Sequence, residues 1–175
     1  MVTPNWSWRD FVAGLAPPRE DGLPRFHPAG VGATAEELDH LETALGLALP
    51  ADLRSLLAEM NGVEDEAAYL RLIMSVEETI RENDKAGEKE YAALCSRNEG
   101  LKKKYAARDV VALPFDQLFI FASRGNGDVF GFPIENNSVR DDRVFDWDHE
   151  MEEVTPFANS LHDFLTQWAT MTARW

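Results

Sequence analysis

The residues best suited to chemistry in this sequence form the run Asp146-Trp147-Asp148-His149-Glu150. In an extended chain Asp146 and Asp148 share one face, because side chains alternate along a strand. Two carboxylates on one face could seat a hard cation or pair with a basic partner, and His149 could complete the site of a small metal-dependent hydrolase. No second cluster of ligands is visible in the sequence, so no metal is predicted. A contact with another protein is the favoured interpretation. The alternative without a binding role is a solvated strand edge.

Acidic residues extend this run on both sides. The predicted partner-binding residues are Asp141, Asp142, Asp146, Trp147, Asp148, Glu150, Glu152 and Glu153. Tryptophan is enriched where binding energy concentrates, and Trp147 alternates with carboxylates. We therefore expect Trp147 to face either the core or the partner.

Other patterns that could support catalysis are weak. Residues 124–128 contain two glycines, but no Lys-Ser/Thr follows and the next segment is a predicted strand, so a hairpin turn explains them better than a phosphate-binding loop. Cys95 has no local histidine that could activate it. Neither G-x-S-x-G nor H-E-x-x-H occurs, and the histidines are scattered at positions 27, 40, 149 and 162. The sequence predicts no enzyme, no catalytic residue and no cofactor.

The charge of the chain is strongly negative. It has 31 acidic against 17 basic residues, a net charge of −14. Such a field repels nucleic acid and anionic membranes and attracts basic surfaces, although solubility alone could also explain it. Residues 34–66 carry nine acidic against one basic residue, and residues 140–163 carry eight against two. We expect a basic protein partner, and neither nucleic acid nor membrane.

The single cysteine and the N-terminal residues suggest the cellular compartment. One cysteine allows no intrachain disulfide, which suits a reducing environment. The first residues lack a basic region followed by an apolar run, and no stretch approaches the roughly 18 apolar residues of a membrane span. A cytoplasmic location is expected.

The elements that must position these residues begin with helices. Apolar spacing predicts a short helix over residues 5–15, followed by a proline- and glycine-rich linker at 17–33. Thr34 and Glu37 form the pattern of a capping box, so a helix starts there and ends at Gly46. The segments expected next are a helix from Pro50 to Asn61-Gly62, an acidic loop at 63–68, a strand at 69–74 and a helix from Ser75 to about Asp84. Residues 84–109 fit either a helical insert or a loop.

Strands dominate the rest of the chain. They are predicted at 118–122, 128–133 and 143–148, and Ser160 then caps a final helix. Helices followed by grouped strands favour an α+β fold with a mostly antiparallel sheet flanked by helices. We expect a single domain over 1–175, in which 1–33 is an N-terminal helix with its linker and 34–172 is the core.

Three segments, in order, resemble a known family. In residues 38–62, a Leu-Gly and Leu-Pro joint separates two helices and the second ends in Asn61-Gly62. In residues 73–80 a strand leads into a serine-capped acidic helix, and in residues 118–134 a Gly-Asn-Gly-Asp turn joins two strands. This ordered set resembles the SUKH superfamily, the Smi/Knr cell-wall-assembly-regulator family. The match spans roughly residues 34–168, and it departs from the family at Val63, where a second glycine is common.

The resemblance implies both a fold and a role. The family has an α+β fold with a mostly antiparallel sheet flanked by helices and has no catalytic motif. Bacterial members look like immunity proteins that bind and neutralise a cognate toxin, often a nuclease, whereas fungal members look like regulatory hubs. We therefore expect an immunity protein with an acidic toxin-binding surface. The alternative is a regulatory scaffold that binds its partner through residues 63–68 or 84–109.

Overall fold

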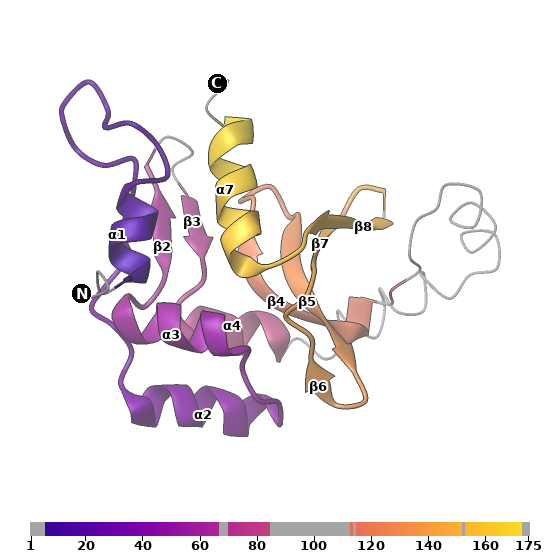
Figure 1. The fold of residues 1–175 in the computed structure, drawn as a ribbon. Helices are drawn as coiled ribbons and strands as arrows, with labels where there is room; N and C mark the ends of the chain where they lie inside the picture. Colours follow the sequence, from indigo (N-terminus) through magenta and orange to yellow (C-terminus); the bar gives the residue numbers. More distant parts are fainter. Residues whose placement is uncertain (1–5, 67–69, 85–112, 114, 152, 173–175) are drawn as a thin grey trace.

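The computed structural model describes residues 6–66, 70–84, 113, 115–151 and 153–172 (Figure 1). In these residues the elements follow one another as α1 (Trp8–Ala13), β1 (Phe26–Pro28), α2 (Ala35–Leu45), α3 (Ala51–Glu59), β2 (Val63–Asp65), β3 (Leu70–Ile73), α4 (Val76–Asn83), a short 3-10 turn (Phe115–Gln117), β4 (Leu118–Ser123), β5 (Val129–Glu135), β6 (Ser138–Val139), β7 (Val144–Asp148), β8 (Glu153–Ala158) and α7 (Leu161–Thr172).

The strands form one antiparallel sheet. Their order is β1-β2-β3-β4-β5-β7-β8, and the short β6 pairs with β5 outside this path. All the described pairs run antiparallel. The predicted α+β class with a mostly antiparallel sheet is therefore confirmed.

The helix starts follow the local signals in the sequence. Thr34 and Glu37 form the predicted capping box at α2, and Ser75 and Glu78 form a second one at α4. Gly46 ends α2 with a left-handed backbone (φ 65°), a conformation that glycine adopts without a steric penalty. These caps satisfy N–H and C=O groups that have no partner within the helix. The capping residues lie next to the helix ends in the sequence, so the caps could be predicted from it.

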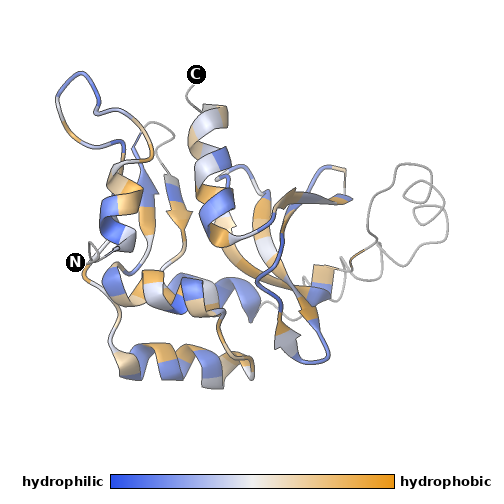
Figure 2. Ribbon diagram, in the orientation of Figure 1, coloured by the Kyte–Doolittle hydropathy of each residue, from blue (hydrophilic) through white to orange (hydrophobic). Residues whose placement is uncertain are grey.

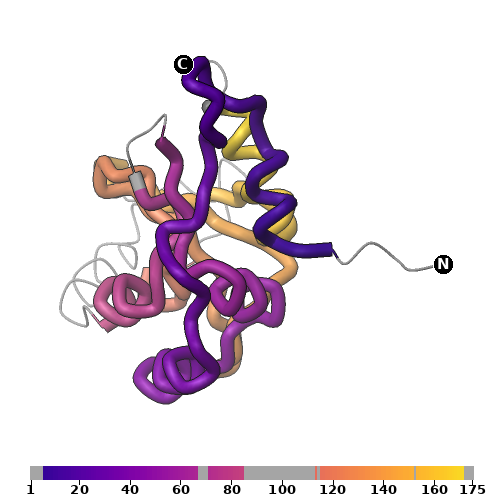
Figure 3. Tube along the Cα trace, turned by 90° about the vertical axis from the view of Figure 1, so that its left-hand side faces the viewer, coloured from indigo at the N-terminus to yellow at the C-terminus, as the bar shows by residue number. Residues whose placement is uncertain are grey.

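The two faces of the sheet bury different sets of side chains. The main core cluster joins α1, α3 and α7 to one face, where Phe121, Phe130 and Phe164 are fully buried. Figure 3 shows α1 and α7 on the same side of the strands, and Phe11 stacks on His162 with ring centroids 4.1 Å apart. Figure 2 shows hydrophobic residues concentrated on β4 and β5. A smaller apolar cluster lies on the opposite face, since its residues alternate with those of the main core.

Four strands differ from the sequence-based expectation. β1 lies inside the predicted linker, and β2 lies inside the predicted acidic loop. Both are three residues long and take their structure from pairing, with Phe26 opposite Asp65 and Pro28 opposite Val63. β6 and β8 also lie outside the predicted strands. β6 has only two residues, and Pro156 inside β8 weakens the strand signal. Residues 85–109 lie outside the described residues.

A buried polar network joins the N-terminal strands to the last helix. Arg25 donates two hydrogen bonds of 2.8 Å to Asp65, through Nε and Nη2. The indole Nε1 of Trp168 donates to Asp65 Oδ2 at 2.9 Å. Asp65 is fully buried, and Arg25 is 8% exposed, so the charged pair sits within the core. A buried carboxylate is tolerated only when it is paired and hydrogen-bonded in this way.

Candidate functional site

The smaller apolar cluster forms the floor of a cavity of about 560 Å³ on the sheet face away from α7. Met74, Phe115, Ile120, Val129 and Trp147 supply the apolar lining. The rings of Phe115 and Trp147 lie 4.3 Å apart between centroids. A concave surface with an apolar lining is the usual form of a binding site. We call it the sheet cavity.

The rim of the sheet cavity is polar. It consists of Arg71, Glu78, Arg81, Glu82, Ser123, Gly125, Gly127 and His149. Arg71 pairs with Glu78 at 3.0 Å and with Glu64 at 3.2 Å. Within the described residues, its buried Nε has no hydrogen-bond partner. An unsatisfied buried donor costs free energy, and an acceptor from a bound partner would reduce that cost.

The strand β7 places its aromatic and acidic residues on opposite faces. Trp147 is half-buried, packs against the smaller apolar cluster and lines the sheet cavity. Asp146 lies on the other face and forms an ion pair with Arg124, whose guanidinium lies 5.0 Å from the centroid of the Phe130 ring. The side chain of Asp146 is only 14% exposed, so this residue is poorly placed for direct contact with a partner.

The other predicted partner-binding residues separate into two groups. Asp148, Glu150 and Glu153 surround the β7–β8 turn, where Asp148 Oδ1 accepts hydrogen bonds of 2.9 Å from the backbone N–H of Glu150 and of Met151. Asp141 and Asp142 are exposed at the opposite end of β7. Asp142 pairs with Arg140 at 2.9 Å, which partly neutralises that end. Glu152 lies outside the described residues. The structure thus gathers only part of the predicted set.

The β4–β5 turn fixes His149 at the rim of the cavity. Asp128 is buried and bonds to His149 Nδ1 at 2.8 Å and to its backbone N–H at 3.1 Å. This hydrogen bond raises the pKa of His149. Gly127 has a φ of 109°, and a Cβ there would lie 3.0 Å from the imidazole, so the glycine permits the close approach. The turn joins paired antiparallel strands, as the hairpin interpretation predicts.

Two groups of side chains in the described residues could hold a metal ion. One is Asp128, Asp148 and His149, and the other is His27, Glu64 and Glu66. Asp146 belongs to neither group. The metal site considered for a hydrolase, which consists of Asp146, Asp148 and His149, is therefore not formed. Sequence reasoning missed the His27 group, because its members lie far apart in the chain and meet only through the pairing of β1 with β2.

The titration of Asp146 can be tested through stability. Burial raises its pKa from 3.8 to about 6, and the negative charges of Asp128 and Asp148 act in the same direction while Arg124 opposes them. As pH rises from about 4 to about 6, the unfolded chain ionises first, so this group makes the folded state progressively less stable. Relative to Asp146→Asn, we expect the wild type to lose about 1–3 kcal/mol of unfolding free energy over that window.

Urea unfolding of both proteins at pH 4, 5, 6 and 7 measures this difference. Most other titrating groups cancel in the comparison, since the two chains differ at one position. A difference that stays constant across the series would contradict the prediction.

Comparison with known proteins agrees with this architecture. The model of the SMI1 / KNR4 family (SUKH-1) matches residues 32–167, which is most of the chain. An antiparallel sheet flanked by helices is the fold that the resemblance in the sequence implies, and the chain belongs to the SMI1 / KNR4 family (SUKH-1). No curated protein matches the chain. Among the described residues, no helix combines the length and apolar character needed to cross a membrane.

Proposed function

We propose that this chain is an immunity protein that neutralises a cognate protein toxin by direct binding and catalyses no reaction. The observation that carries the proposal is its membership of the SMI1 / KNR4 family, whose bacterial members resemble immunity proteins. The net charge of −14 supports a basic partner, such as a nuclease whose phosphate-binding surface would be covered. Such a complex forms in the cytoplasm of the cell that the protein protects.

The sheet cavity and the β7–β8 turn form the surface that we assign to the toxin. His149 lines the cavity, and its neighbours Asp148 and Glu150 are part of the turn, so the two features adjoin. An apolar side chain of the toxin would occupy the cavity, while basic side chains would meet the carboxylates. Interfaces commonly combine a buried apolar anchor with a charged rim in this way.

Charge-neutral substitutions at the turn test the electrostatic part of this assignment. In Asp148→Asn/Glu150→Gln, the asparagine keeps the oxygen that accepts the backbone hydrogen bonds of the turn. We expect association with the toxin to slow about tenfold at low salt, because long-range attraction steers charged partners together. The measurement is surface plasmon resonance at several salt concentrations, with the product of the neighbouring gene as the partner.

The matched control carries the same change of charge elsewhere. Glu36→Gln/Asp52→Asn lies in the first turns of α2 and α3. Figure 1 shows both helices well separated from the β7–β8 turn. The association rate of this variant is expected to stay within about twofold of the wild type. Equal slowing of both variants would mean that net charge, and not this surface, guides binding.

A regulatory scaffold is the alternative function. Of the segments suggested for it, residues 63–65 are paired in β2 and Asp65 is buried, so they form no free acidic loop. Co-expression of the chain with its neighbouring gene decides between the two functions. Rescue of growth from a toxic neighbour supports the immunity role, whereas a neighbour without toxicity and without binding favours the scaffold.

A further inference from the structure

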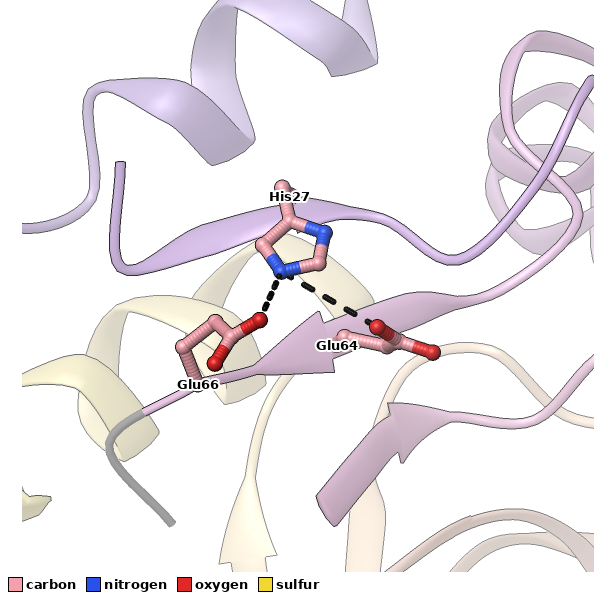
Figure 4. A group of neighbouring side chains, drawn as sticks. All are labelled: His27, Glu64 and Glu66. Carbon is pink, nitrogen blue, oxygen red and sulfur yellow. Dashed lines mark hydrogen bonds and ion pairs between the residues drawn. The ribbon is translucent and has the colours of Figure 1, made fainter. Parts of the chain in front are cut away.

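The outer face of β1 and β2 brings three potential metal ligands together (Figure 4). His27 lies opposite Glu64 in the register of the two strands, and Glu66 follows directly after β2. Phe26 and Asp65 point into the core, so the alternation of each strand directs the three ligands outward. His27 and both glutamates are partly exposed and therefore accessible to an ion.

The separations of the donor atoms fit one small ion. Nε2 of His27 lies 3.1 Å from Oε1 of Glu66 and 3.9 Å from Oε2 of Glu64. Nitrogen and oxygen ligands about 2.0–2.1 Å from a tetrahedral zinc ion are about 3.3 Å apart. The observed separations bracket this value, so a small adjustment of the two glutamates would place all three atoms around the ion. Figure 4 shows both carboxylates turned toward the same ring nitrogen.

Groups behind the three ligands hold them in this orientation. The imidazole Nδ1 lies 3.2 Å from the backbone oxygen of Pro28, which directs Nε2 at the carboxylates. Arg19 donates to Oε2 of Glu66 and Arg71 donates to Oε1 of Glu64, each at 3.2 Å. Each carboxylate thus keeps its other oxygen toward His27. Metal-binding histidines usually donate their second N–H to a carbonyl or carboxylate, and metal-binding carboxylates are themselves hydrogen-bonded.

The local charge balance also favours a divalent cation. Arg19 pairs with Asp21 as well as Glu66, and Arg71 pairs with Glu78 as well as Glu64. Four carboxylates therefore share two guanidinium groups, which leaves a charge of −2 when the imidazole is neutral. Nε2 of His27 lies within hydrogen-bond distance of Oε1 of Glu66, and a bound cation would replace this contact with coordination of both atoms.

We propose that His27, Glu64 and Glu66 form a binding site for a divalent zinc ion. One imidazole with two carboxylates suits zinc better than Mg²⁺ or Ca²⁺, which prefer sites made of oxygen ligands alone. The bound ion joins the edge strand β1 to β2 and, through Arg19, holds the loop before β1. The site lies apart from the β7–β8 turn, and Arg71, which holds Glu64, also lines the sheet cavity. The proposal departs from the sequence-based expectation of no metal.

The second group, Asp128, Asp148 and His149, is less suited to an ion. Oδ1 of Asp128 already accepts from the backbone and pairs with the ring of His149, and Oδ1 of Asp148 caps the β7–β8 turn. An ion held by the ring of His149 and Oδ1 of Asp128 would compete with the hydrogen bond between them. This group provides an internal control, because it has the same types of ligand in a different place.

Zinc titration of the full chain, with any purification tag removed and after treatment with a chelator, tests the site. By isothermal calorimetry at neutral pH we expect about one Zn²⁺ per chain, and Mg²⁺ should bind at least about tenfold more weakly. His27→Ala and Glu66→Gln should each weaken Zn²⁺ binding about tenfold or more. Glutamine preserves the shape of Glu66, so this variant keeps the test valid even if His27→Ala unfolds the edge strand.

Two control variants show where the ion binds. His149→Ala removes the second candidate group, and His40→Ala removes an exposed histidine on α2; both should bind Zn²⁺ as the wild type does. Loss of binding in His149→Ala with retention in His27→Ala would overturn the proposal. Equal binding of Mg²⁺ and Zn²⁺, or no binding of zinc by the wild type, would overturn it as well.

Discussion

Asp65→Ala is expected to lower the free energy of unfolding by about 3–5 kcal/mol, because it leaves the guanidinium of Arg25 buried without its counter-charge. Arg25 is 8% exposed and makes both of its short hydrogen bonds to this carboxylate. The change also removes the acceptor of the Trp168 indole. Urea unfolding at neutral pH, followed by tryptophan fluorescence and by circular dichroism, measures the effect.

Two further variants test whether the loss of stability comes from the buried charge. Asp65→Asn keeps one oxygen and the side-chain volume, so its loss should be large but smaller than that of Asp65→Ala. Asp141→Asn removes a carboxylate from an exposed position and should change stability by less than about 0.5 kcal/mol. An Asp65→Ala protein as stable as Asp141→Asn would show that the network does not hold the N-terminal strands to the core.

Phe164→Ala is expected to cost a similar amount, about 3–5 kcal/mol, through a different mechanism. Phe164 is fully buried on α7, and its ring centroid lies 4.9 Å from that of Phe130 and 5.3 Å from that of Phe121. Truncation removes apolar area and leaves a cavity that these rings cannot fill. The same unfolding experiment applies.

The control for this variant lies on the same helix. Met171 is 41% exposed, so Met171→Ala removes few contacts and should change stability by less than about 0.5 kcal/mol. If Phe164→Ala lost no more than Met171→Ala, α7 would not be packed on the sheet as described.

Elements with a local chemical signal could be predicted from the sequence. The helix starts at Thr34 and Ser75 and the helix end at Gly46 depend on neighbours within a few residues, and all three occur where the sequence places them. The apolar run that forms β4 is long enough to be predicted as a strand from the sequence. By contrast, β1 and β2 are three residues each, and only long-range pairing makes them strands. Such pairing leaves no periodic pattern in so short a segment.

The candidate site shows the same limit. The acidic and aromatic alternation of β7 correctly separates Asp146 and Asp148 from Trp147, but it could not show that Arg124 covers Asp146. The sheet cavity takes its lining from β3, α4, β4, β5 and β7 and from the short turn before β4, and no one segment reveals it. His27 lies in a loop-like stretch, and nothing near it in the sequence points to Glu64 or Glu66. Only the fold brings these residues together.

The hydrogen bond from Trp168 to Asp65 also has a consequence for the order of folding. It connects positions 103 residues apart, and α7 is the last of the described elements to be synthesised. Until α7 emerges from the ribosome, Asp65 on β2 lacks the indole donor of Trp168. Contacts of such long range slow folding. The complete hydrogen-bonded network of Arg25, Asp65 and Trp168 can therefore form only after residue 168 has been synthesised, and a protein shortened before α7 would lack the indole donor to Asp65.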